Sequence, residues 1–392
     1  LCANYPFVLA PGMGLNAYFA YTVVLQMGYS WEMALAAVFV EGVVFIVLSV
    51  TNVREAIFNS IPMNLKYAVS VGIGLFIAFI GFQNAKIVVD SATLVSLYSF
   101  KGAVAAGTFS SEGITVVLAM IGILITGILV VKNVRGNILW GILITWALGM
   151  ICQLTGLYVP NPDAGAYTLF PTLGITDFTK LSQTFGQCFK LDFGNVGILN
   201  FVVVIFSFLF VDLFDTLGTL IGVSTKANML DKDGKLPAIK PALLADAVAT
   251  SAGAVFGTST TTTFVESSAG VAAGGRTGLT ALTTAVLFLI SMLFAPIFTA
   301  IPSFATAPAL ILVGFLMFST VTEIKLTEDT YTSAIPAYLC IIAMPLFYSI
   351  SEGISIGVIS YVIINLICGK RKEINPIMYV LAVLFILKYI FL

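Results

Sequence analysis

The chain has 392 residues, of which 59% are hydrophobic and 9% are charged, and its formal net charge is −1. Soluble domains carry about a quarter charged residues, so this composition excludes an ordinary soluble protein and indicates an integral membrane protein. The net charge excludes a nucleic-acid-binding protein that works by neutralising phosphates, and a sequence without histidine excludes a histidine-ligated metal or proton relay. We expect neither a metal nor a cofactor.

Long apolar runs follow one another along the chain, and spanning a bilayer takes about 20 such residues. The strongly apolar runs are 31–50, 63–82, 114–131, 136–154, 200–223, 279–297, 307–320, 333–350, 354–368 and 374–392. Two further runs, 12–27 and 241–256, are rich in Gly, Ala and Asn or Asp, which predicts that they face protein or water rather than lipid. We therefore predict about twelve crossings and one long polar loop at 155–195.

Two segments break the helical pattern, at 5–14 and at 257–265. The first holds two prolines and a Gly-x-Gly, and the second holds a run of threonines. Proline and successive threonines disfavour helix, and threonine runs favour extended chain. Each segment is predicted to be a short strand that leads into a half-helix starting near the middle of the membrane. Extended chain at that depth must be buried and paired, for example strand to strand.

A short internal repeat relates the two halves of the chain. Residues 57–62 (IFNSIP) recur as residues 297–302 (IFTAIP), each followed by an apolar span that contains glycine. Lysine and arginine favour one set of alternating loops by 13 to 4, with Lys388 left aside, which makes that set cytoplasmic. The two copies then lie on opposite sides of the membrane. Inverted repeats with a site at their interface are typical of secondary transporters.

Acidic residues occur inside the apolar runs. Asp212 and Asp215 share one face of the run 200–223, and Glu266 follows the threonine-rich segment. An ionised carboxylate in hydrocarbon costs about 2.5–3.5 kcal/mol or more, so such groups are expected to face a polar cavity and bind something there. This pattern predicts a transporter. Glu41, inside the run 31–50, is expected to form a hydrogen bond between helices.

Three motifs resemble the AzgA-like adenine/guanine/hypoxanthine permeases of the nucleobase–ascorbate transporter superfamily. They are APGMGLNAYFAYTVV at 10–24, VDLFDTLGTLIG at 211–222 and FVESSAGVAAGGRTGLTAL at 264–282. The resemblance covers essentially the whole chain. It implies an all-α integral membrane protein with an inverted seven-plus-seven-span repeat, divided into core and gate domains, with two short strands leading into half-helices. In that family two spans precede the first motif, so the resemblance implies that the first two spans are missing here.

The resemblance also implies a division of the chain. The core domain would comprise 1–56 and 197–299, the gate domain 57–160 and 300–392, and an extracellular or periplasmic loop 161–196. The run 374–392 would follow the fourteenth span. The protein would lie in the cell (inner) membrane as a multi-pass protein, with a possible homodimer through the gate domain.

The function implied is uptake of purine nucleobases (guanine, hypoxanthine or adenine) by proton symport with elevator-type alternating access. The residues implied to bind the base are Asn16, Asp212, Asp215, Glu266 and Ser267. Asp246, Gly12 and Gly14 would support them. The candidates for carrying the proton are Asp212, Asp215 and Glu266, because a low-dielectric cavity favours the protonated form of a carboxyl group.

Several alternatives remain open on the sequence. Sodium could replace the proton as the coupling ion. A uracil/xanthine or anion carrier could use the same fold, although three carboxylates disfavour an anion. An intramembrane aspartyl protease is a remote alternative, since here the two aspartates share one helix. We expect a transporter rather than an enzyme.

Overall fold

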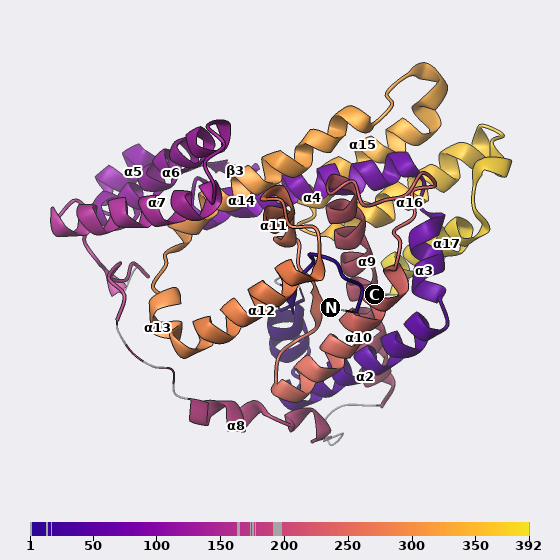
Figure 1. Ribbon diagram of the computed structural model, residues 1–392, viewed down its shortest axis with the longest axis horizontal. Coiled ribbons are helices and arrows are strands. Elements are labelled where there is room, and N and C mark those ends of the chain that lie inside the picture. Colours follow the sequence, from indigo (N-terminus) through magenta and orange to yellow (C-terminus); the bar gives the residue numbers. More distant parts are fainter. Residues whose placement is uncertain are drawn as a thin grey trace. The chain divides into compact units, whose positions relative to one another are not determined.

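The computed structural model describes residues 2–12, 15, 16, 18–162, 165–172, 174, 176, 178–190 and 198–391 (Figure 1). These residues form two compact units. Unit 1 comprises Leu1–Ile73, Asp177–Thr284 and Met317–Leu392, and unit 2 comprises Gly74–Thr176 and Ala285–Leu316. These compact units do not test the predicted core and gate domains, which stay a prediction.

Unit 1 is built from three stretches of the chain. The first holds β1 (Leu9–Pro11), the π-helix η1 (Tyr18–Gln26), α2 (Trp31–Val50), α3 (Val53–Ser60) and the start of α4 (Met63–Asn84). The second holds η4 (Phe178–Lys180), α8 (Leu181–Thr184), η5 (Gln187–Phe189), α9 (Ile198–Lys226), α10 (Ile239–Phe256), β4 (Thr261–Thr263), α11 (Ser267–Ala272) and the start of α12 (Gly278–Leu293). The third holds η6 (Ser319–Glu323), η7 (Glu328–Thr330), α15 (Tyr331–Leu346), α16 (Ile350–Ile367), η8 (Arg371–Glu373) and α17 (Pro376–Phe391).

Strands β1 and β4 form an antiparallel pair, which confirms the strands predicted from the prolines and threonines. Leu9 lies opposite Thr263, and Pro11 lies opposite Thr261. Main-chain hydrogen bonds extend the pair on both sides, from the Phe264 amide to the Val8 carbonyl (2.8 Å) and from the Gly12 amide to the Thr260 carbonyl (3.3 Å). The whole of β4 is buried, so its backbone groups need these partners.

Helix α10 packs against β4, and α2 runs alongside α10 (Figure 1). Ser30 begins α2, because its hydroxyl accepts a hydrogen bond from the Met33 amide. Gly257 ends α10 with φ +91°, a conformation that glycine adopts without strain. Between these ends the helices meet at Gly42, where an added Cβ would lie 2.7 Å from the Ser251 amide nitrogen. This close approach brings the neighbouring part of α2 to the strand pair.

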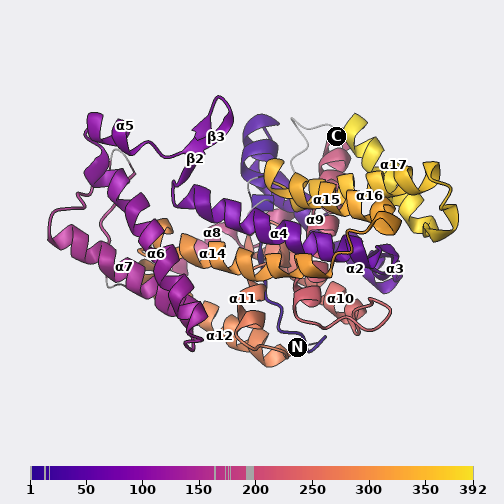
Figure 2. The same ribbon diagram turned by 90° about the horizontal axis from the view of Figure 1, so that it is seen from above.

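Unit 2 contains mainly the helix pair α6 and α7, which lie side by side in both views (Figures 1 and 2). Its elements are the end of α4, β2 (Val88–Ser91), β3 (Leu94–Leu97), α5 (Phe100–Ala105), the π-helix η2 (Phe109–Gly113), α6 (Ile114–Val131), α7 (Asn137–Leu154), the end of α12, α13 (Ala295–Phe298) and most of α14 (Ser303–Phe318). The β2–β3 hairpin was not predicted from the sequence. It pairs Val88 with Leu97 and Ser91 with Leu94.

Eight helices within the described residues are long and apolar enough to cross a membrane. They are Trp31–Val50, Met63–Asn84, Phe109–Val131, Asn137–Leu154, Phe201–Lys226, Ile239–Phe256, Ser303–Glu323 and Ile350–Ile367. Each of them matches one of the predicted apolar runs. The other predicted runs form shorter elements: α12, α15 and α17 have 16 residues each, and η1 has nine. Two prolines, Pro336 and Pro345, lie inside α15.

Candidate functional site

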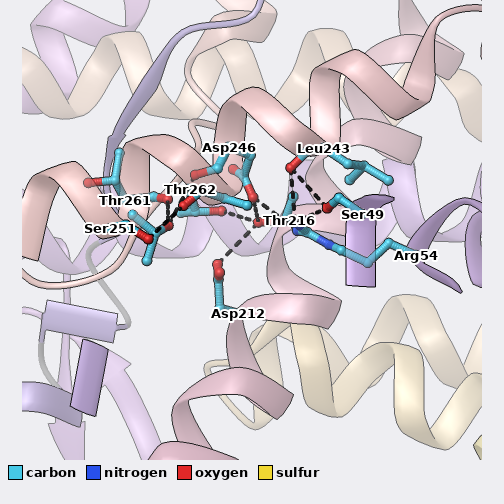
Figure 3. A network of polar contacts seen from close by, with 11 residues as sticks. Ser49, Arg54, Asp212, Thr216, Leu243, Asp246, Ser251, Thr261 and Thr262 are labelled. Carbon is cyan, nitrogen blue, oxygen red and sulfur yellow. Dashed lines mark hydrogen bonds and ion pairs between the residues drawn. The ribbon is translucent and has the colours of Figure 1, made fainter. Parts of the chain in front are cut away.

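Helix α9 carries the two predicted aspartates of the site, one turn apart. Asp212 is completely buried, whereas Asp215 is partly exposed. The Thr216 hydroxyl lies between two carboxyl groups, 3.1 Å from Asp212 Oδ1 and 3.4 Å from Asp246 Oδ2 (Figure 3). It also lies 2.6 Å from the Thr262 hydroxyl of β4. Because a hydroxyl has one hydrogen, Thr216 donates to one carboxyl group at a time.

Arg54 of α3 extends this hydrogen-bond network by binding Asp246. Its Nη2 donates to Asp246 Oδ2 at 2.9 Å, and both side chains have no exposed surface. Its Nη1 donates to the Leu243 carbonyl at 3.1 Å, and the guanidinium lies 4.3 Å from the centre of the Phe45 ring. Arg54 is therefore buried against α10.

Glu41 of α2 joins the same region through the segment that leads into β4. The Thr260 hydroxyl donates to Glu41 Oε2 at 2.9 Å. Side chains alternate along extended chain, so Thr260 and Thr262 face the same side, toward Glu41 and Thr216 respectively. Thr250 of α10 donates to the Thr261 carbonyl at 2.6 Å. The segment Thr260–Thr263 is thus joined to α2, α9 and α10 by threonine hydroxyls.

Gly12, Asp215 and Glu266 lie near one another beside the strand pair. A Cβ added at Gly12 would lie 2.9 Å from Thr262 Cγ2 and 3.8 Å from Asp215 Oδ2. Glu266 immediately precedes α11, is partly exposed, and lies close enough to Asp215 for the two charges to interact. The structure therefore brings together two carboxyl groups that keep some exposure, and it packs Gly12 closely against Thr262 next to one of them.

Two other predicted binding residues make contacts with the strand segments. Ser267 Oγ accepts a hydrogen bond of 2.9 Å from the Val8 amide, and the Ser259 hydroxyl donates to Asn16 Oδ1. Gly14 lies outside the described residues. The roles assigned to the predicted site residues stay predictions. No group of three or more His, Cys, Asp or Glu side chains in the described ranges is arranged to hold a metal ion.

Comparison with known proteins identifies the family. The sequence profile of the Permease family matches residues 1–356. The chain belongs to the Permease family. It is 46% identical over 393 residues to guanine/hypoxanthine permease PbuO of Bacillus subtilis, a match that covers 99% of the chain and 85% of that protein. It is 37% identical over 392 residues to adenine permease AdeQ of Escherichia coli, covering 99% of the chain and 81% of that protein.

A solved structure shows the same fold. The transmembrane domain of the cyanobacterial bicarbonate transporter BicA superposes with a TM-score of 0.56 at 16% identity, covering 91% of the chain and 86% of that domain. At this identity the likeness concerns the fold alone. It confirms the predicted fold class, and membership of the Permease family confirms the family resemblance. The protein is a multi-pass membrane transporter and not an enzyme, so the protease alternative is wrong.

Proposed function

We propose that this transporter takes up purine nucleobases across the cell membrane. The observation that carries the proposal is the high identity, over 99% of the chain, to proteins named guanine/hypoxanthine permease and adenine permease. The chemistry of the site supports it. A purine presents ring N–H and exocyclic groups along one edge, and a carboxylate can accept two hydrogen bonds from such an edge.

In this proposal Asp215 and Glu266 bind the edge of the base. Their partial exposure supports the role, since a ligand must reach them. Gly12 lets the backbone of the strand pair come close to Asp215, where any side chain would crowd Thr262. Asn16 Oδ1 already accepts a hydrogen bond from Ser259, and Ser267 Oγ accepts one from the Val8 amide. The Asn16 amide N–H groups and the Ser267 O–H would then donate hydrogen bonds that orient the base.

We further propose that a proton drives uptake, by symport with elevator-type movement. The fully buried Asp212 supports this step, because a buried carboxyl group strongly favours its neutral form over its charged form. Protonation would cancel charge in the site, so that substrate-loaded helices could move through the membrane at a lower energetic cost.

The substrate class is tested by uptake of radiolabelled hypoxanthine, guanine and adenine into proteoliposomes, with unlabelled uracil, xanthine and bicarbonate as competitors. We expect saturable uptake of at least one purine that the other purines inhibit. Uptake of none of the three labelled purines, or purine uptake that uracil or bicarbonate inhibits and unlabelled purines do not, would overturn the proposal.

The coupling ion is tested in the same vesicles. A protonophore is expected to abolish accumulation against a gradient, while replacement of sodium by potassium is expected to leave it intact. The opposite pair of results would assign the coupling to sodium.

A further inference from the structure

Acidic side chains outnumber basic ones in the buried cluster next to β4. Glu41, Asp212, Asp246 and Arg54 have no exposed surface, and the acidic and basic groups lie within electrostatic range of one another. Fully ionised, three carboxylates and one guanidinium leave a net charge of −2. Arg54 makes its ion pair with Asp246. Glu41 and Asp212 form no salt bridge with any residue that the structure describes.

The hydrogen bonds of these two acids fit a neutral form. Each has one oxygen that accepts from a threonine hydroxyl, Glu41 from Thr260 and Asp212 from Thr216. The other oxygen of each, Glu41 Oε1 and Asp212 Oδ2, is buried without a hydrogen-bond partner among the described residues. Asp246 Oδ1 also has no partner among the described residues, but Asp246 has the Arg54 guanidinium beside it, whereas the other two acids have no cation. A buried carboxylate without a cation is costly, and the neutral acid avoids that cost. The cluster is electrically neutral when both acids are protonated.

The same two acids are linked to the segment that carries Glu266. Glu41 accepts a hydrogen bond from the Thr260 hydroxyl, and Asp212 is connected to Thr262 through the Thr216 hydroxyl. These threonines lie two residues apart, and β4 ends three residues before Glu266. A change in charge on Glu41 or Asp212 therefore acts directly on the short segment that leads to the proposed substrate carboxylate.

We propose that Glu41 and Asp212 form one proton-binding site behind β4, separate from the substrate-facing Asp215 and Glu266, and that Glu41 carries the coupled proton. The proton adds to a carboxylate oxygen of Glu41 on one side of the membrane and leaves it on the other. The Arg54–Asp246 ion pair, which carries no net charge, lies next to this site in both states. This inference rests on the proposed proton symport.

The test is Glu41→Gln in proteoliposomes, with Glu32→Gln as the matched control in the first turn of the same helix. Glutamine keeps an oxygen that can accept from Thr260, so a purely structural role of Glu41 survives the change. Proton influx on addition of hypoxanthine is recorded with an internal pH dye, and exchange of labelled for unlabelled hypoxanthine is recorded separately.

We expect Glu41→Gln to retain exchange within about threefold of wild type, to lose at least tenfold in proton influx, and to show a flat dependence of uptake on external pH. Glu32→Gln should match wild type in all three measurements. Wild-type influx of protons with unchanged influx in Glu41→Gln would overturn this inference alone. Wild-type uptake of hypoxanthine without any proton influx would overturn the proposed symport and this inference together.

A second variant covers the case in which Glu41→Gln does not fold, as judged by gel filtration. Glu41→Asp keeps a titratable group at the same position and is expected to retain proton influx with hypoxanthine at an altered pH optimum. Thr260→Val removes the hydroxyl that Glu41 accepts from, and it is expected to shift the pH profile of uptake. A wild-type pH profile in both variants would contradict the inference.

Discussion

Arg54 of α3 and Asp246 of α10 form an ion pair of 2.9 Å between two side chains that have no exposed surface. Removing one partner of such a pair leaves a charge buried without compensation, at a cost of about 3–5 kcal/mol. We therefore expect Arg54→Met to lower the thermal unfolding temperature of the purified protein clearly. The double variant Arg54→Met/Asp246→Leu should recover much of the loss, because no unpaired charge remains. A double variant as unstable as the single one would show that the pair is not what stabilises this contact.

Glu266→Gln is expected to weaken binding of hypoxanthine by roughly 10- to 150-fold, corresponding to about 1.5–3 kcal/mol for hydrogen bonds to a charged group. Glutamine offers one acceptor oxygen and no charge, so it cannot accept two N–H groups from the base. Binding to the detergent-purified protein is measured by isothermal calorimetry. Glu328→Gln in η7, at an exposed position, serves as the control. Affinity near that of wild type would remove Glu266 from the site.

Gly12→Val is expected to reduce hypoxanthine binding strongly. The first added carbon would already lie 2.9 Å from Thr262 Cγ2 and 3.8 Å from Asp215 Oδ2, so the larger side chain must displace the strand or fill the space beside the aspartate. Gly127→Val in α6 is the matched control, since no described atom lies within 4 Å of the Cβ position there. If both variants bind equally well, Gly12 does not shape the site.

Gly42→Leu is expected to destabilise the protein by about 1–3 kcal/mol, the usual cost of overfilling a packed interface. An added Cβ would lie 2.7 Å from the backbone nitrogen of Ser251, which cannot move without shifting α10. The measurement is again the thermal unfolding temperature. Val43→Leu, on a neighbouring exposed position of α2, should leave that temperature within about a degree of wild type, since exposed substitutions change stability little.

The sequence predicts the elements of this fold better than it predicts its buried polar contacts. Hydropathy locates the spanning helices because the signal lies within each run of residues. The paired strands are also predictable, since prolines and threonines disfavour helix locally. The β2–β3 hairpin was missed because its strands have only four residues each, which is too short to stand out in a search for membrane-spanning runs.

The partners of Arg54 and Glu41 could not be predicted in this way. Asp246 is 192 positions from Arg54, and Thr260 is 219 positions from Glu41. No local pattern connects residues so far apart. Lys66 shows the same limit, because its buried ammonium group donates to the Gly234 carbonyl at 2.5 Å, 168 positions along the chain. In the sequence, a single basic residue near a helix end resembles a loop residue, because its buried partner is far away along the chain.

The antiparallel pairing of β1 with β4 sets an order of events during synthesis. Leu9 and its partner Thr263 are separated by 254 positions. At about 5–20 residues per second, the ribosome needs on the order of 13–50 s after the first strand emerges before the second one exists. Throughout that interval the backbone of β1 must find other hydrogen-bond partners or remain outside the apolar layer, because unpaired amides are costly there. The predicted site is therefore completed only after the earlier helices have been made. A nascent chain stalled before Thr261 would contain several membrane helices and no β1–β4 pair.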